Sequence, residues 1–270
     1  MAAGSAHPVR TLRELVTLFE AAMTLTVAEP GPRSVHQLRT TARRIEAQLE
    51  LLALLPDLPD HAKPAKMAHK LLRKIRRTAG PVRDLDVQRD LVPFKSDEAD
   101  QLRSLFQRRR KQAAKKLLNA IHKRRNKLTR ALEALLEALA PAESLTIPAA
   151  HLATLVLGWY ADNAPVAAKQ NHRQLHGIRK AAKLARYIAE SAASTRSLAR
   201  TFESLQQSGG NWHDWLTLSA IAHRELGDSS PLVQTFARHC KKSLVDYRSH
   251  LKSLPQLLAP ASSVAARRRA

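Results

Sequence analysis

The chain has 270 residues, of which 44% are hydrophobic, and its 45 Lys and Arg against 23 Asp and Glu give a formal net charge of +22. Long stretches of Ala, Leu, Lys and Arg with 8 Gly and no strand-like alternation indicate a folded, all-α protein with a sizeable core and exclude a mainly β fold. So large a charge repels itself in the compact state, which favours an anionic partner: nucleic acid, an anionic membrane or an inorganic phosphate polymer.

Capping residues and helix-breaking Pro and Gly divide the first half of the sequence into predicted helices. Residues 11–29 are predicted to form a helix closed by a Pro-Gly-Pro sequence, and Ser34 is predicted to cap a second helix that runs to Leu55. A third helix, 64–79, is predicted to stop at Gly80-Pro81, where a fourth begins. The pattern at 97–140 predicts one long helix or two stacked end to end.

The second half repeats this order after a connection at 141–148. Helices are predicted at 149–163, around His176, at 196–207, at 214–226 after a Gly209-Gly210 break, and from Pro231 to about Leu254. Residues 259–270, which include three consecutive arginines, are predicted to be a disordered basic tail. We therefore expect a single domain at 10–258, with halves at about 10–140 and 148–258.

A histidine followed by basic residues at helical spacing occurs once in each half. The two sets are His36, Arg39, Arg43 and His176, Arg179, Lys183, Arg186. Offsets of 3, 7 and 10 return to a sector about 80° wide on a helix, so each set forms one ridge. Each ridge residue follows an apolar residue that repeats at steps of 3 and 4, which places the ridge at the edge of a packed face.

Other basic residues lie outside these ridges. Lys66, Lys70, Arg73 and Arg77 share one strip of a helix, which fits a solvated face as well as a ligand face. Residues 101–132 contain twelve Lys or Arg and no acid. Near Gly80, Asp84 and Asp86 suit the first turn of a helix, and Asp84 is placed to orient a neighbouring arginine.

The sequence resembles the CHAD family, the conserved histidine α-helical domain. The resemblance rests on V-H-Q-L-R-T-T-A-R-R-I at 35–45, G-P-V-R-D-L-D-V at 80–87 and L-H-G-I-R-K-A-A-K-L-A-R-Y at 175–187, and it covers residues 12–254. It implies two pseudo-symmetric four-helix bundles from an internal repeat, with a basic groove between them that binds inorganic polyphosphate. The chain departs from the family pattern at Glu46 and Leu184, where basic residues are common, and it lacks the E-x-E-x-K motif of an accompanying triphosphate-tunnel domain.

On this basis the expected function is non-catalytic binding of polyphosphate, with targeting to polyphosphate granules. The candidate binding residues are His36, Arg39, Arg43, Arg44, Lys66, Lys70, Arg73, Arg77, His176, Arg179, Lys180, Lys183 and Arg186. Further candidates outside the ridges are Arg83, Arg109, Lys116, Arg124, Arg238, His239, Lys242 and Arg248. Phosphate favours the protonated imidazole, so we expect affinity to rise as pH falls through about 6 to 7.

Two alternative functions are weighed against this one. A nucleic-acid binder fits the charge, but the chain is only 4% aromatic and shows no zinc finger, zipper or RNP motif. A phosphoanhydride-processing enzyme needs carboxylates to hold divalent ions, and Asp84, Asp86 and Asp214 are sparse for that role.

The expected compartment and partners follow from the lack of paired cysteines, zinc-site clusters, secretion signals and long apolar stretches in the sequence. Cys240 has no partner for an intramolecular disulfide, and no Cys/His cluster has zinc-site spacing, so we expect a reducing compartment, no metal and no cofactor. There is no secretion-signal pattern, and the longest apolar stretch, 152–161, is too short to span a membrane. The expectation is a cytoplasmic protein that binds no membrane.

Overall fold

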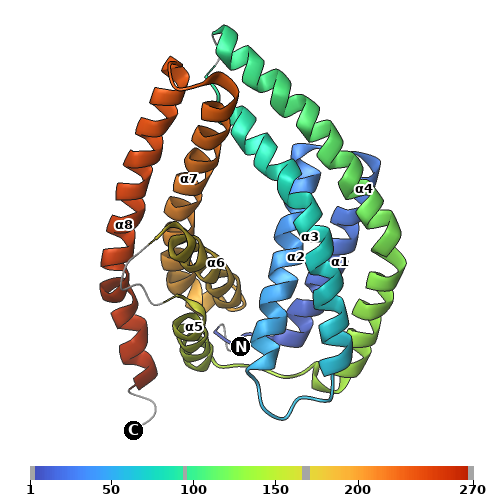
Figure 1. Ribbon diagram of the computed structural model, residues 1–270. Coiled ribbons are helices and arrows are strands. Elements are labelled where there is room, and N and C mark those ends of the chain that lie inside the picture. The colour runs from blue at the N-terminus through green and yellow to red at the C-terminus, as the bar shows by residue number, and fades with distance from the viewer. Residues whose placement is uncertain (1–3, 94–95, 166–170, 267–270) are drawn as a thin grey trace. The chain divides into compact units, whose positions relative to one another are not determined.

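The computed structural model describes residues 4–93, 96–165 and 171–266, and in these it contains eight α-helices. Their bounds are α1 Pro8–Ala28, α2 Pro32–Ala53, α3 Ala62–Leu91, α4 Asp97–Leu139, α5 Ala149–Asn163, α6 His172–Ala189, α7 Arg196–Leu226 and α8 Pro231–Ala266 (Figure 1). Two 3-10 turns follow α4 and α6, and the β pairing in the described residues is one isolated bridge between Ala6 and Ile147. The expected all-α class is confirmed.

The chain divides into two compact units. Unit 1 comprises residues 1–86, 108–149 and 190–194, and unit 2 comprises 87–107, 150–189 and 195–270. This division differs from the expected halves, because the end of α3 and the beginning of α4 group with the later helices. A hydrogen bond from Ser230 Oγ to Glu98 Oε2, 2.9 Å long, joins the beginning of α4 to the residue before α8.

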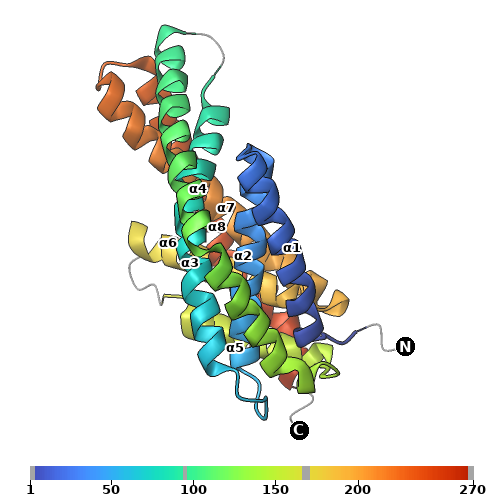
Figure 2. The same cartoon turned by 90° about the vertical axis from the view of Figure 1, so that its right-hand side faces the viewer.

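The core of unit 1 is built from the apolar faces of four helices. α1 packs along α2 (Figures 1 and 2), and side chains of α3 and α4 complete the cluster. Fully or almost fully buried members include Leu12, Phe19, Leu38, Ile45, Leu72, Ile75, Leu117 and Leu128. The seam at Val35, Leu38, Ala42 and Ile45 is entirely buried, as the period of the sequence predicts.

Unit 2 is organised around aromatic side chains. α7 packs on both α6 and α8. Trp212 stacks on Tyr247 with ring centroids 5.8 Å apart, and the Tyr247 hydroxyl donates to the Leu175 carbonyl at 2.9 Å. These contacts fix α8 against α6 and α7 through buried groups, with the phenol's hydrogen bond satisfied.

Two predicted helix breaks are wrong. α3 continues through Pro81, because Ile75, Ala79 and Val82 on either side are fully buried and their packing outweighs an interior proline's cost of about 3 kcal/mol. α7 likewise continues through Gly209 and Gly210. There the glycine serves close packing, since a Cβ at residue 209 would lie 2.7 Å from the Tyr247 ring.

Two predicted helix ends also need correction. Ser34 lies inside the first turn of α2, whose N-cap is Gly31, and the Ser34 hydroxyl donates to the Glu29 and Gly31 carbonyls instead. α8 runs to Ala266, well beyond Leu254, and includes Pro255. The expected tail therefore overlaps α8, and its three arginines at 267–269 lie outside the described residues.

Candidate anion-binding faces

The ridge on α2 lies at the edge of the unit 1 core, as predicted. His36 is exposed, whereas Arg39, Arg43 and Arg44 are partly buried. Each of the first three follows a fully buried residue of the seam. Arg44 Nη2 makes a 3.0 Å ion pair with Glu190. This carboxylate, which belongs to the same unit, neutralises part of the Arg44 charge.

Arg39 extends from α2 to the backbone of α3. Its Nη1 atom donates to the Arg76 carbonyl at 3.4 Å, and its Nη2 atom lies 3.9 Å from Asp84 Oδ1. Asp84 thus lies near an arginine, and its role in orienting that arginine stays a prediction. A Cβ at residue 80 would lie 3.0 Å from Arg39 Nη1, so Gly80 provides the space for this approach.

The basic strip on α3 points to the same side as this contact. Lys66, Lys70, Arg73 and Arg77 are all exposed, and buried apolar residues lie opposite them. Seven residues make almost two helical turns, so Arg73 lies within about 20° of Gly80 around the helix axis. We call the eight candidates on α2 and α3 the α2–α3 face: His36, Arg39, Arg43, Arg44, Lys66, Lys70, Arg73 and Arg77.

The ridge on α6 meets α7 in unit 2. His176 and Arg179 are partly buried, Lys180 is exposed, and Lys183 and Arg186 are partly buried. A Cβ at Gly210 would lie 3.8 Å from Arg179 Nε, which is an ordinary contact distance. We call the α6 candidates His176, Arg179, Lys180, Lys183 and Arg186, together with the α7 residues that they contact, the α6–α7 face.

One histidine of the α6–α7 face, His213, is not among the residues predicted from the sequence. The ring of His213 lies 4.7 Å from the ring of His176, at an angle of 45°. Burial, with a smaller contribution from Arg179, lowers the pKa of His213 to about 4. The only sequence signal was its place in N-W-H-D directly after the glycine pair, which was interpreted as a helix break.

The two faces carry side chains of opposite charge at one pair of matching positions. Ten residues after each ridge histidine stand Glu46 and Arg186. Arg76 Nε donates to Glu46 Oε1 at 2.9 Å, whereas Arg186 Nη1 donates to Gln206 Oε1 at 3.2 Å. Arg76 and Gln206 each precede their glycine by four residues. At Glu46 the first helix of the pair carries the acid and α3 carries the base, whereas in unit 2 the first helix carries the base, Arg186, and its partner Gln206 is a neutral amide.

Arg186 makes several contacts within unit 2 that the sequence did not predict. Its Nη2 atom lies 2.8 Å from Glu203 Oε1, in addition to the bond with Gln206, and its side chain is 19% exposed. Its guanidinium also lies 5.5 Å from the ring centroid of Tyr187. These contacts orient Arg186 and neutralise part of its charge, so its role in binding remains a prediction.

The further candidates have mixed surroundings. Lys116, Arg238, Lys242 and Arg248 are exposed, while Arg83 and Arg109 are partly buried. Arg124 Nη1 donates to the Ala120 carbonyl of its own helix at 3.2 Å, and His239 stacks on Trp215 with centroids 4.5 Å apart.

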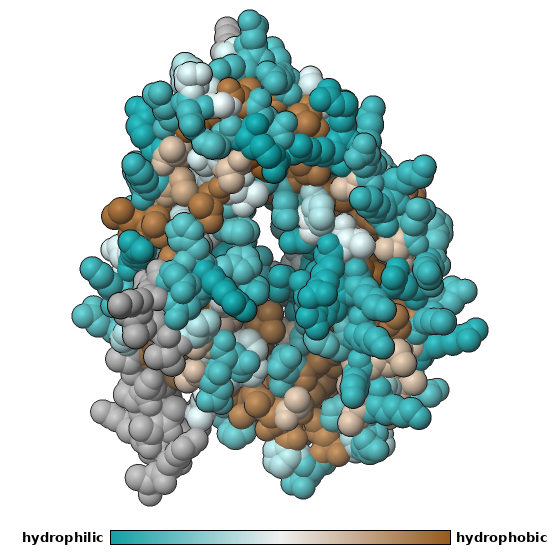
Figure 3. Space-filling view, viewed as in Figure 1, coloured by the Kyte–Doolittle hydropathy of each residue, from teal (hydrophilic) through white to brown (hydrophobic). Residues whose placement is uncertain are grey.

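One arginine of the long basic run has a structural role instead. Arg110 Nε donates to Asp86 Oδ1, and Arg110 Nη2 donates to the Pro30 carbonyl at 2.9 Å. The Asp86 side chain is fully buried, so this ion pair stabilises unit 1 where α3, α4 and the α1–α2 turn meet. On the side of α4 the visible surface is mostly hydrophilic, with apolar side chains scattered among the polar ones (Figure 3).

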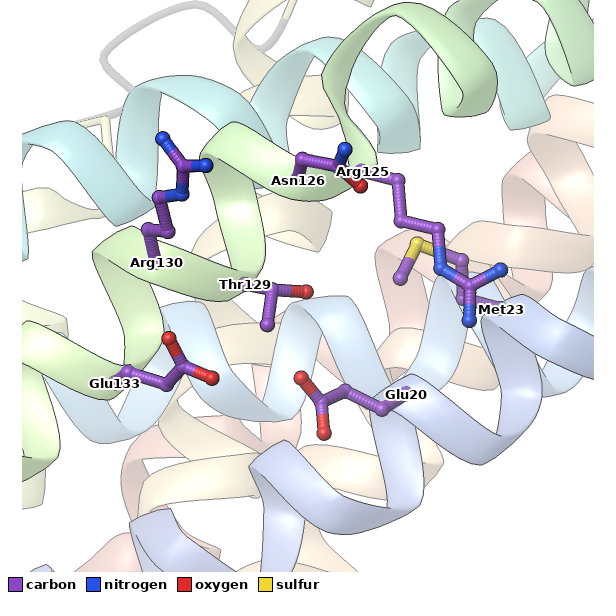
Figure 4. A pocket seen from close by; sticks show the side chains of 7 residues that line it. All are labelled: Glu20, Met23, Arg125, Asn126, Thr129, Arg130 and Glu133. Carbon is purple, nitrogen blue, oxygen red and sulfur yellow. The ribbon is translucent and has the colours of Figure 1, made fainter.

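A hollow between α1 and α4 lies apart from the predicted residues. It has a volume of about 450 Å³ and is lined by Glu20, Met23, Arg125, Asn126, Thr129, Arg130 and Glu133. Figure 4 shows the Glu20 and Glu133 carboxylates on either side of Thr129. The two carboxylates balance the charges of Arg125 and Arg130, so the lining has no excess positive charge for a polyanion and we do not assign it to phosphate binding.

A family model described as CHAD domain matches residues 10–223. The chain belongs to the CHAD domain family. Among solved structures it is similar to the crystal structure of the CHAD domain from the plant Ricinus communis, with 19% identity, a TM-score of 0.62, and coverage of 97% of this chain and 93% of that chain. It also matches PptA from Streptomyces chartreusis at 19% identity and a TM-score of 0.48, covering 95% and 98%. No curated protein matches the chain.

The CHAD assignment confirms the resemblance inferred from the three motifs, and the likeness to the plant CHAD domain supports the all-helical fold. Two further observations concern the described residues only. No group of three or more His, Cys, Asp or Glu side chains there is arranged to hold a metal ion. None of the helices in that part of the chain has the length and apolar character needed to cross a bilayer.

Proposed function

We propose that the chain binds inorganic polyphosphate through its α2–α3 and α6–α7 faces and does not convert it chemically. The observation that carries this proposal is the placement of the ridge arginines. Three residues after each ridge histidine, an arginine lies beside a glycine of the neighbouring helix: a Cβ at Gly80 would lie 3.0 Å from Arg39 Nη1, and a Cβ at Gly210 would lie 3.8 Å from Arg179 Nε. A guanidinium held at a helix edge beside a histidine suits the oxygens of a phosphoryl group.

The charge distribution supports a long polyanion rather than a single phosphate. Exposed cations continue along α3 from Lys66 to Arg77, a span of about 16 Å at the rise of an α-helix. Each phosphoryl oxygen that pairs with such a cation releases condensed counterions. Binding should therefore be tight at low salt and weaken steeply as salt is added.

The environment of the tryptophans favours polyphosphate over nucleic acid. Trp159 and Trp212 are 7% and 1% exposed, and Trp215 is already stacked on His239. Proteins that bind single strands without sequence preference stack bases on exposed aromatic rings. Polyphosphate has no bases, so arginine, lysine and histidine are sufficient to bind it. In a cell, such binding would place the chain on polyphosphate granules.

The test is a titration with polyphosphate of defined chain lengths at several salt concentrations. Arg39→Glu and Arg179→Glu should each weaken binding by about tenfold or more and lower the salt slope by about one, because a phosphate contact is lost. Arg10→Glu on α1 and Lys241→Glu on α8 are matched controls, since both residues are exposed and lie outside the two faces. These controls should bind nearly as the wild type does.

Three results would redirect the proposal. Displacement of long-chain polyphosphate by DNA at equal phosphate concentration would favour a nucleic-acid function. Release of inorganic phosphate from polyphosphate in the presence of magnesium or manganese would show an enzyme. Equal losses in the control variants would mean that net charge alone, rather than the two faces, drives association.

A further inference from the structure

The α6–α7 face holds a second histidine beside the ridge histidine. The His213 and His176 rings are 4.7 Å apart, and both side chains are partly buried. His213 is fixed by its neighbour Trp212, which is 1% exposed and stacks on Tyr247. The two imidazoles thus form a pre-arranged pair at the surface of a rigid aromatic core.

A cation lies next to this pair. Arg179 is close enough to His213 to disfavour its protonation. Its Nε atom is buried, and the described residues provide no acceptor for it. A buried donor without an acceptor costs free energy, so this atom gains from any oxygen that reaches it.

We infer that His176, Arg179 and His213 bind one phosphoryl group together, and that His213 takes up a proton when the anion arrives. This inference rests on the proposed polyphosphate function. A neutral imidazole presents one N–H donor and one lone pair, and the lone pair repels a phosphoryl oxygen. The protonated ring presents two donors and a charge, so an anion stabilises that form.

The charged and titratable groups around His213 are consistent with this change. From α6 it is faced by His176 and Arg179, and along α7 the next residue is Asp214. Burial lowers the pKa of His213 to about 4, so the ring is neutral in the free protein at physiological pH. Burial also raises the pKa of Tyr160 on α5 to about 12 and raises that of Tyr247 on α8, so neither phenol supplies charge.

The size of the effect follows from linkage. If the bound imidazole returns to its ordinary pKa of about 6.5, binding strengthens roughly eightfold between pH 7 and pH 5.5 through His213 alone. At pH 5.5 this corresponds to an uptake of about one proton per bound α6–α7 face. Replacement of His213 by a side chain that does not titrate removes both this proton uptake and the roughly eightfold dependence of affinity on pH.

The experiment compares the wild type with His213→Gln by calorimetry with long-chain polyphosphate at pH 5.5 and pH 7, in buffers of different ionisation heat. The wild type should take up about one proton more than His213→Gln at pH 5.5. The matched control is His223→Gln, which changes an exposed histidine on the same helix, about 15 Å further along the axis. It should keep the wild-type uptake.

A second readout does not depend on the variant's stability. In the wild type, the His213 ring signals in NMR, assigned by their loss in His213→Gln or by sequential assignment, should change from the neutral to the charged form on adding polyphosphate at pH 5.5. Binding with no change at His213, or equal proton uptake in both chains, refutes this inference alone. Absence of wild-type binding refutes the proposed function instead.

Discussion

Arg39 Nη1 would lie 3.0 Å from a Cβ atom at residue 80, so the lack of a side chain at Gly80 allows the guanidinium to rest against α3. From this position Arg39 reaches the Arg76 carbonyl and approaches Asp84. The matching contact in unit 2 is looser, since a Cβ at Gly210 would lie 3.8 Å from Arg179 Nε. The two glycines therefore place different limits on substitution.

Gly80→Ala should separate stability from binding. Alanine is favoured over glycine inside a helix by about 0.5 to 1 kcal/mol, and the only close neighbour of the new methyl group is the flexible end of Arg39. Urea unfolding should show equal or higher stability, while calorimetry should show weaker polyphosphate binding because Arg39 is displaced.

Gly210→Ala is the matched control for that change. Its methyl group meets only an ordinary contact, so stability should rise with little change in affinity. Equal losses of affinity in both variants would show that the close approach of Arg39 to α3 does not matter for binding.

Gly209→Ala should destabilise the protein although the substitution lies next to Gly210. Its Cβ would lie within 2.7 to 3.2 Å of three carbons of the Tyr247 ring, which is fully buried and held by its bond to Leu175. Overpacking of this kind costs about 1 to 3 kcal/mol. If α7 is continuous, thermal unfolding should show a lower Tm for Gly209→Ala and a higher Tm for Gly210→Ala. Similar small changes in Tm for the two variants would indicate a flexible break.

The helical period predicted the buried seams, but glycine and proline did not mark the helix ends. Val35, Leu38, Ala42 and Ile45 are buried as expected, because a period of 3 and 4 residues is a local property of the sequence. At Pro81 and Gly209 the local preference for a break is outweighed by buried neighbours from other helices. Such tertiary contacts are not visible from the spacing of residues.

The same reason limited the prediction of the site. The ridge residues were found because each ridge lies within one helix. His213 belongs to a different helix from His176, so only the packing of α7 on α6 brings the two rings together. Likewise, nothing in the basic run distinguished Arg110, whose partner Asp86 precedes it by 24 residues.

Asp86→Asn should strongly destabilise unit 1. The Asp86 side chain is fully buried and Arg110 is 18% exposed, so the change leaves a largely buried guanidinium without its counter-charge. Removal of one partner from a buried ion pair costs about 3 to 5 kcal/mol. Asp84→Asn is the control, because that carboxylate is 61% exposed and its loss should cost less than about 1 kcal/mol. Similar denaturation midpoints for the two variants would contradict a structural role for the Asp86–Arg110 pair.

The stability of the free protein should fall as pH decreases from about 6.5, partly because of His213. Its pKa is about 4 in the folded chain and the ordinary value, about 6.5, in the unfolded chain, so the unfolded state binds more protons between these values. The free energy of unfolding therefore decreases as pH falls through this window. The slope from this one group is below about 1.4 kcal/mol per pH unit, because a single imidazole exchanges at most one proton, and solvent screening of a partly buried ring lowers it further.

Chemical denaturation between pH 5 and pH 7 isolates this contribution as the difference between the wild type and His213→Gln, with His223→Gln as the control. The range stays above the pH at which most carboxylates titrate, so the shared background is small. Added polyphosphate should reverse the effect at pH 5.5, because the bound anion stabilises the protonated ring that otherwise opposes folding. A stability slope that is the same in the wild type and His213→Gln would mean that His213 titrates normally in the folded protein and cannot couple proton uptake to binding.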